Sequence, residues 1–216
     1  MAIGENQARR RTDAVVAARI ETIIRIAAVG AGVMTLVAPV WVLLRVSGTS
    51  AAGEGEGESP YPRPWGILVA TIFLVVIGVI LWRPSPIVFS ERVGLSLSLL
   101  GGLVYFPAIG MYLWGLRSLG SMFRVSSAFG ARLPKHHALV EHGPYRVIRH
   151  PMYLGVILAA AGALLIFRTW AMVLFFPLSF VVVARAQREE QVLSISYGQA
   201  WREYTGRVPG WIPRVR

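Results

Sequence analysis

The stretch MYLGVILAAAGALLIFRTWAMVLFFPLSFVVVA, from Met152 to Ala184, holds 33 residues and one charge, Arg168. As a single straight helix it would measure about 50 Å, which is too long for a bilayer core of roughly 30 Å. We therefore predict a hairpin of two short helices, about Met152 to Phe167 and Thr169 to Ala186, with its turn at Arg168.

Small residues recur at every fourth position of the first arm, at Gly155, Ala159 and Ala163. This spacing lets membrane helices approach closely, so we predict that the stripe faces the second arm. In the second arm, Pro177 lacks a backbone N–H and predicts a kink.

Three more uncharged runs precede residue 120, and each is long enough to span a bilayer. They are Ile26 to Leu44, Trp65 to Trp82 and Val93 to Leu116, of 19, 18 and 24 residues. With the two hairpin arms they predict an all-α integral membrane protein of about five transmembrane helices. We divide the chain into an N-terminal membrane region, 1–116, and a core, 117–216, that carries the chemistry.

The composition supports a membrane protein and excludes other classes. Hydrophobic residues make up 55% of the chain and charged residues 15%, against about a quarter charged in soluble domains. In so apolar a chain, the excess of 22 Lys and Arg over 11 Asp and Glu indicates loops beside a bilayer rather than a nucleic-acid partner. The absence of cysteine excludes disulfides, thiolate metal sites and thiol nucleophiles.

The basic residues also predict an orientation. Six lie in 117–150 and six in 185–216, two stretches that five crossings put on the same side of the membrane. This excess predicts that the loop and the C-terminal tail are cytoplasmic. Because the number of crossings is odd, Arg9, Arg10 and Arg11 lie on the other side. This is against the tendency of basic residues to lie on the cytoplasmic side.

All four histidines lie between His136 and His150, inside PKHHALVEHGPYRVIRHPMYLG, residues 134–155. A metal site that includes Glu141 is one interpretation, although adjacent His136 and His137 do not share a face of a helix or strand. A pH-sensitive loop at the membrane surface is another.

The start of the first hairpin arm favours a binding site. The proline after His150 suits the first turn of a helix, which leaves His150 at the cap. Free N–H groups there, beside Arg146 and Arg149, suit an anion. The aromatic faces of Tyr145 and Tyr153 suit a cation. An anion site beside a cation site favours a zwitterionic ligand.

Matched elements lie on both sides of the hairpin. They are His137-x-Leu139-Val140, Gly143-x-Tyr145 and Arg149-His150-Pro151-x-Tyr153-x-Gly155, then Arg185 with Glu189 and Glu190, Tyr197-Gly198, and Arg207-Val208-Pro209. In these elements, over about residues 117 to 213, the chain resembles the isoprenylcysteine carboxyl methyltransferases and their bacterial, phospholipid methyltransferase-like membrane relatives.

The resemblance implies that S-adenosylmethionine binds in a pocket formed by the loop and closed by the hairpin and the tail. The implied cofactor contacts are His137, Ala138, Leu139, Val140, Gly143, Tyr145, His150, Pro151, Met152, Tyr153, Glu189 and Glu190. It also implies that Arg185 meets the acceptor and that Arg185 and Glu189 are catalytic. A further polar contact of the family falls near Gly130, so here it is missing or comes from a neighbour such as Ser127.

The chemistry agrees with this resemblance. Methyl transfer from a sulfonium is an in-line displacement, which needs alignment and exclusion of water. An acceptor carboxylate needs no general base, and none stands out in the sequence, so we expect a carboxylate on a lipophilic or prenylated acceptor. The charged fork of Arg185 suits a carboxylate, although an ordinary surface pair with Glu189, four residues on, is an alternative.

Three other functions stay open. One is N-methylation of a phospholipid head group, and another is a non-enzymatic membrane binding protein. The third is a sterol-type reductase that uses NADPH; such enzymes usually carry Asn and an acidic residue where this chain has Met152 and Val156. The tail is either a membrane anchor through Trp211 or a cover over the pocket.

Overall fold

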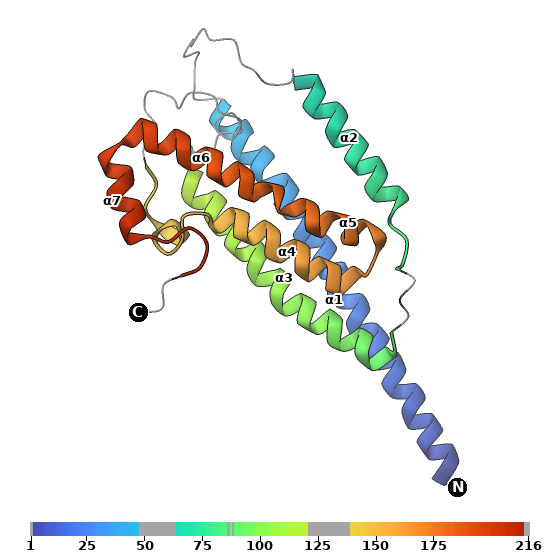
Figure 1. The fold of residues 1–216 in the computed structure, drawn as a ribbon. Helices are drawn as coiled ribbons and strands as arrows, with labels where there is room; N and C mark the ends of the chain where they lie inside the picture. The colour runs from blue at the N-terminus through green and yellow to red at the C-terminus, as the bar shows by residue number, and fades with distance from the viewer. Residues whose placement is uncertain (1, 48–63, 86, 88, 121–138, 214–216) are drawn as a thin grey trace.

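The computed structural model describes residues 2–47, 64–85, 87, 89–120 and 139–213 (Figure 1). Every regular element in this part of the chain is a helix, which confirms the predicted all-α class. In chain order the helices are α1 Ala2–Ser47, α2 Pro64–Ile80, α3 Glu91–Leu119, the 3-10 helix η3 Gly143–Arg146, α4 Pro151–Phe167, α5 Trp170–Ser179, α6 Val181–Tyr197 and α7 Gln199–Arg207.

Helices α3 and α4 pack closely because glycines face each other across their interface. A Cβ added at Gly101 or at Gly162 would lie 2.8 Å from the carbonyl oxygen of the other glycine. At Gly155 an added Cβ would lie 2.9 Å from the carbonyl oxygen of Ala108 in α3. The small-residue stripe of α4 therefore faces α3, and the prediction that it faces the second arm was wrong. The reason is that α3 offers glycines to this face, whereas α5 contains none.

Helix α1 packs into the same core. The hydroxyl of Tyr105 in α3 donates a hydrogen bond of 2.9 Å to the carbonyl oxygen of Ala28 in α1. A buried cluster of Ala28, Tyr105, Ile109, Ala163 and Ile166 surrounds this bond. The N-terminal helix thus shares its core with the hairpin.

The hairpin turns at Arg168, as predicted. This residue adopts a left-handed conformation with φ of 51°. Its guanidinium donates to the Ser98 hydroxyl and to the Gly94 carbonyl oxygen of α3, each at 3.0 Å, and pairs with the carboxylate of Glu21 in α1. The paired side chains are 16% and 21% exposed. One arginine therefore connects α1, α3 and the hairpin.

The segment between α2 and α3 is bonded to the same turn. The Ser85 N–H donates to the Arg168 carbonyl oxygen at 2.9 Å, and the Trp170 N–H donates to the Arg83 carbonyl oxygen at 3.1 Å. The end of α2, the starts of α3 and α5 and the end of α4 thus meet at one place, beside Glu21 in the first half of α1.

The second hairpin arm is longer than predicted. It does not end at Ala186 but continues through α6 to Tyr197, with an interruption at Phe180. The Phe180 N–H donates to the Pro177 carbonyl oxygen, three residues back, at 3.2 Å. This tighter turn follows a proline that removes one helical donor, so the interruption comes where a kink was predicted.

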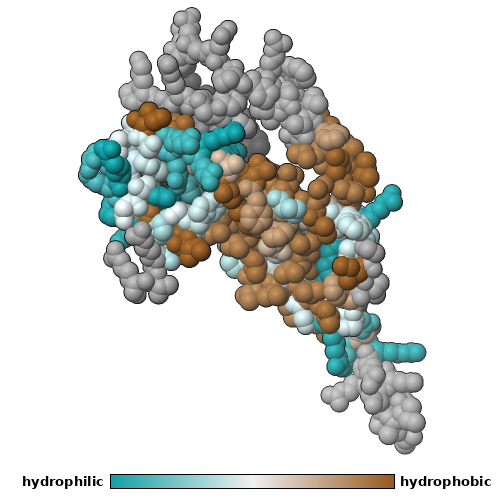
Figure 2. Space-filling model, in the orientation of Figure 1, coloured by the Kyte–Doolittle hydropathy of each residue, from teal (hydrophilic) through white to brown (hydrophobic). Residues whose placement is uncertain are grey.

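Three stretches in the described residues are long and apolar enough to cross a bilayer: Arg11–Pro39, Glu91–Leu119 and Trp170–Tyr197. They support an integral membrane protein, and hydrophobic residues cover the middle of the face shown in Figure 2. Helices α2 and α4 have 17 residues each, or about 25 Å, so the count of five crossings stays a prediction. The start of α1 and the C-terminal helices lie at opposite ends (Figure 1).

We expect Gly162→Leu to lower the free energy of unfolding by about 1–3 kcal/mol, because the new side chain would overlap the α3 backbone. Gly110→Leu is the matched control, since nothing lies within 4 Å of a Cβ at Gly110. It should change stability by less than about 0.5 kcal/mol. Thermal unfolding in detergent measures both, and equal shifts would contradict the close approach of α3 and α4.

We expect Arg168→Ala to cost about 1–3 kcal/mol, because it leaves Ser98 and the Glu21 carboxylate without their shared donor. Glu21→Ala should cost a similar amount. In a double-mutant cycle followed by thermal unfolding, the two losses should be less than additive. Fully additive losses would show that the pair contributes nothing.

Candidate functional site

The loop that precedes α4 rests on the end of α3. Leu139 and Val140 enter it half-buried, and Gly143 follows with φ of 61°, a conformation that favours glycine. A Cβ at Gly143 would meet the Ser118 hydroxyl and lie 3.3 Å from the indole nitrogen of Trp114. Gly143 therefore brings the loop against α3.

Tyr145 and Met152 pack on α3 at a second glycine. A Cβ at Gly115 would lie 2.6 Å from Cγ of Met152 and 3.6 Å from the hydroxyl of Tyr145. Burial raises the pKa of Tyr145, and the nearby Glu189 carboxylate raises it further. The phenol is therefore protonated at neutral pH and is no general base there.

His150 is the N-cap residue of α4 and is 5% exposed. Its Nε2 lies 2.7 Å from Oε1 of Glu190, and the same oxygen lies 3.1 Å from the guanidinium of Arg149. Arg149 also lies over the ring of Trp201, 5.9 Å from its centroid. One carboxylate of α6 thus holds two residues at the start of α4.

The second carboxylate of α6 reaches α4 as well. The Tyr153 hydroxyl donates to Oε2 of Glu189 at 2.9 Å, and the Arg185 guanidinium lies 5.8 Å from the centroid of the Tyr153 ring. Five of the residues implied by the resemblance therefore come together. We call this set the polar cluster: His150, Tyr153, Arg185, Glu189 and Glu190.

The C-terminal tail lies against the polar cluster. The N–H groups of Arg149 and His150 donate to the carbonyl oxygens of Pro209 and Gly210, at 2.9 and 3.1 Å. The Trp211 ring lies 5.2 Å from the His150 ring and is half-buried. These contacts favour a cover over the cluster rather than a membrane anchor alone.

Helix α7 fastens the tail to the loop. Trp201, Tyr204 and Val208 form a buried cluster on which Leu139 packs. The Tyr204 hydroxyl donates to the Tyr145 carbonyl oxygen at 2.8 Å. Burial raises the pKa of Tyr204 to about 12, so this donor is protonated at neutral pH.

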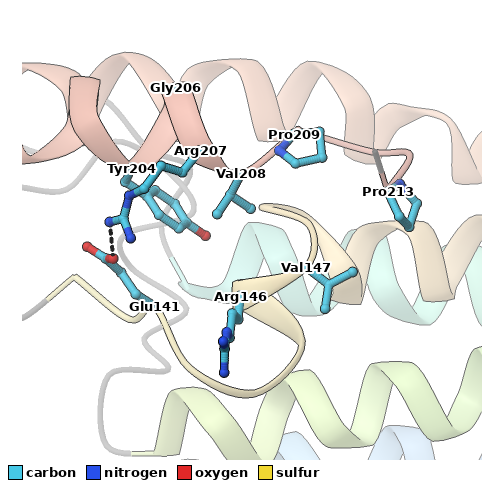
Figure 3. A pocket seen from close by; sticks show the side chains of 9 residues that line it. All are labelled: Glu141, Arg146, Val147, Tyr204, Gly206, Arg207, Val208, Pro209 and Pro213. Carbon is cyan, nitrogen blue, oxygen red and sulfur yellow. Dashed lines mark hydrogen bonds and ion pairs between the residues drawn. The ribbon is translucent and has the colours of Figure 1, made fainter. Parts of the chain in front are cut away.

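A pocket of about 570 Å³ lies where the loop and the tail meet (Figure 3). Its lining consists of Glu141, Arg146, Val147, Tyr204, Gly206, Arg207, Val208, Pro209 and Pro213. None of the implied cofactor contacts is among them. Arg146 lines this pocket while Arg149 joins Glu190, so the two arginines expected beside the α4 N-terminus have different surroundings.

Other implied contacts lie elsewhere. His137 and Ala138, like Gly130 and Ser127, are outside the described residues. Pro151 is fully buried at the start of α4, and Met152 is almost fully buried. The metal interpretation depends largely on residues outside the described ranges; within those ranges no three His, Asp or Glu residues gather to hold a metal ion.

Three residues of the site were absent from the implied contacts: Arg149, Trp201 and Trp211. Arg149 stands in the Arg-His-Pro element, which was a usable signal. The two tryptophans come from the tail and α7, and nothing in their local sequence shows that they lie beside Arg149 and His150.

Known proteins are similar to this chain over the region that contains the polar cluster. A family model described as phospholipid methyltransferase matches residues 96–200. Protein-S-isoprenylcysteine O-methyltransferase B of Arabidopsis thaliana is 30% identical over 138 residues, 52% of this chain and 66% of that protein. These matches support the resemblance to the isoprenylcysteine carboxyl methyltransferase family.

Two further relatives carry other names. Methanethiol S-methyltransferase 2 of Bradyrhizobium diazoefficiens is 31% identical over 152 residues, 62% of this chain and 53% of that protein. A Delta(14)-sterol reductase of Mus musculus is 30% identical over 156 residues, 63% of this chain and 37% of that protein. The chain thus spans less than two thirds of the length of each of these relatives.

The raised pKa of Tyr204 predicts a pH dependence. The folded state keeps a proton that the unfolded chain loses above about pH 10, so stability should fall as the pH rises from about 10 to about 12. Tyr204→Phe should make this fall smaller and should cost about 1 kcal/mol at neutral pH, through the lost bond to Tyr145. Thermal unfolding at pH 8 and pH 11 measures both; an unchanged fall would contradict the assignment.

Proposed function

We propose that this chain, as a relative of the isoprenylcysteine carboxyl methyltransferases, transfers a methyl group from S-adenosylmethionine to a carboxylate on a lipophilic or lipid-tethered acceptor. The observation that carries the proposal is the pairing of Glu189 and Glu190 with Tyr153 and His150. It joins the elements on either side of the hairpin into one site, and the names of the matched relatives support methyl transfer.

The donor set of the polar cluster fits this cofactor. The N-terminus of α4 suits the carboxylate of the methionine part. The two glutamates of the cluster suit an ammonium group or ribose hydroxyls, and the rings of His150, Tyr153 and Trp211 suit a sulfonium. When bound, the cofactor supplies an electrophilic methyl group.

The residues of this chain would then act by orientation. Arg185 lies beside Tyr153 and has the planar fork that binds a carboxylate through two hydrogen bonds. A carboxylate acceptor is already ionised at neutral pH, so the site needs no general base. The protonated phenol of Tyr145 agrees with this, because it is a donor and not a base.

The tail would exclude water. Trp211 lies on His150, and two backbone hydrogen bonds hold residues 209–210 against the loop. A low-water site strengthens electrostatic contacts and would keep water from competing with the acceptor for the electrophilic methyl group. Opening of this tail would be required for the cofactor to enter.

One observation favours a second candidate, N-methylation of a phospholipid head group: the description of the family model that matches residues 96–200. An amine acceptor must lose a proton before it attacks. In the polar cluster, the groups that accept protons are His150 and two carboxylates, and each already has a hydrogen-bond partner.

We expect calorimetric titration of the detergent-purified chain to detect binding of S-adenosylmethionine and not of NADPH. His150→Ala and Glu189→Gln should each weaken binding by about tenfold, because each removes one strong hydrogen bond to the cofactor or within its site. Glu203→Gln, an exposed residue of α7, is the matched control and should bind as wild type. Tighter binding of NADPH would favour the sterol reductase alternative. If neither ligand bound, both the methyltransferase and the reductase interpretations would be contradicted.

Transfer of a labelled methyl group into a membrane lipid extract identifies the acceptor class. We expect the label to be in a methyl ester, from which mild base releases it as labelled methanol. We also expect Arg185→Ala to abolish the transfer. Arg185→Lys should restore little of it, because an ammonium lacks the fork. Base-stable label on an amine head group would establish the phospholipid alternative instead.

A further inference from the structure

The pocket between the loop and the tail is separate from the polar cluster. It opens beside η3 and the end of α7, and Figure 3 shows Arg146, Val147 and Pro213 around it. No residue of the polar cluster lines it. The proposed methyl transfer therefore leaves this pocket without a role.

The pocket carries one net positive charge. Arg207 pairs with Glu141 at 2.8 Å, which neutralises both side chains. Arg146 is exposed and forms no ion pair with any residue in the described part of the chain. Among the described residues that line the pocket, its charge is therefore the one without a partner carboxylate. A permanently charged fork of this kind binds a phosphate or carboxylate through parallel hydrogen bonds.

Apolar surface borders this cation. Val147, next to Arg146, is 48% exposed, and Ile212 in the tail is 78% exposed. The lining itself contributes Val208, Pro209 and Pro213. A ligand that fits both surfaces has an anionic group joined to an apolar body.

The pocket also lies at the expected height of the membrane surface. The loop rests on α3 at Trp114 and Ser118, where the uncharged run of α3 ends. Trp114 is exposed, as aromatic residues at a bilayer interface are. An anionic amphiphile at this height is a membrane phospholipid rather than a soluble metabolite.

We propose that this pocket binds the phosphate group of an anionic phospholipid, with Arg146 on the phosphate oxygens and Val147 and Pro213 against the glycerol and the first chain carbons. The volume of about 570 Å³ is in the range of small-molecule sites, and suits a head group with its glycerol. The lipid would bridge η3 and the tail, and so favour the position in which the tail covers the polar cluster. This proposal does not depend on the proposed methyl transfer.

The test is calorimetric titration of the full-length chain, purified in uncharged detergent, with dioctanoyl phosphatidylglycerol. We expect it to bind at least about tenfold more tightly than dioctanoyl phosphatidylcholine, whose head group carries a compensating cation. Arg146→Ala should reduce the affinity for phosphatidylglycerol by about tenfold, and Arg146→Lys should restore part of it. Arg188→Ala is the control for general attraction, because Arg188 is exposed on α6 and outside the pocket; it should bind within about twofold of wild type.

Four results would overturn the proposal. Equal affinities for the two lipids, or equal losses in Arg146→Ala and Arg188→Ala, would leave only general attraction to a charged surface. Glycerol 3-phosphate binding as tightly as the lipid would assign the pocket to a free phosphate. Loss of S-adenosylmethionine binding in Arg146→Ala, with lipid binding kept and an unchanged unfolding midpoint, would assign the pocket to the cofactor.

Discussion

The Arg168 guanidinium is held by Glu21 and by two oxygens of α3 while its backbone reverses the chain. Because of this reversal, residues 36 and 40 positions apart meet at the other end of α4, as Tyr153 with Glu189 and His150 with Glu190. The polar cluster is therefore assembled by a turn that lies a whole helix away. An unpaired arginine at a membrane boundary would turn its charged group toward water. The partly buried ion pair with Glu21 instead holds the guanidinium against the helices and so fixes the turn.

A second constraint sets how far α4 stands from α3. Gly101 and Gly162 leave no room for a side chain between the two backbones, and Gly115 leaves just enough room for Met152 at the start of α4. The family model runs from residue 96 in α3 to the first residues of α7, so it contains both the glycine contact and the polar cluster. Glu21 lies outside this region, and the partner that holds the turn comes from α1.

The sequence predicted features that depend on neighbouring residues and missed those that depend on a distant partner. The hairpin followed from its length and its single charge, and the motif elements led to the polar cluster because each is short and contiguous. The helix predicted to pack against the small-residue stripe was the wrong one. The regular spacing of small residues such as Gly155 in one helix does not show which other helix offers glycines. Glu21 was missed for a related reason: hydropathy treats a charge as the boundary of a membrane segment, whereas here it pairs with Arg168 across the bundle. Trp211 needed the fold of the tail.

The excess of basic residues is therefore a poor measure of the cations available to ligands. Arg149 and Arg207 are neutralised by glutamates that hold the loop to α6 and to α7, and Arg168 is neutralised in the same way by α1. These ion pairs stabilise the arrangement of the helices, so the arginines in them are engaged by the protein itself. Arg146 differs because it lines a pocket whose lining contains no carboxylate of α6. In a chain with few acidic residues, the position of each carboxylate decides which arginines are structural and which can bind a ligand.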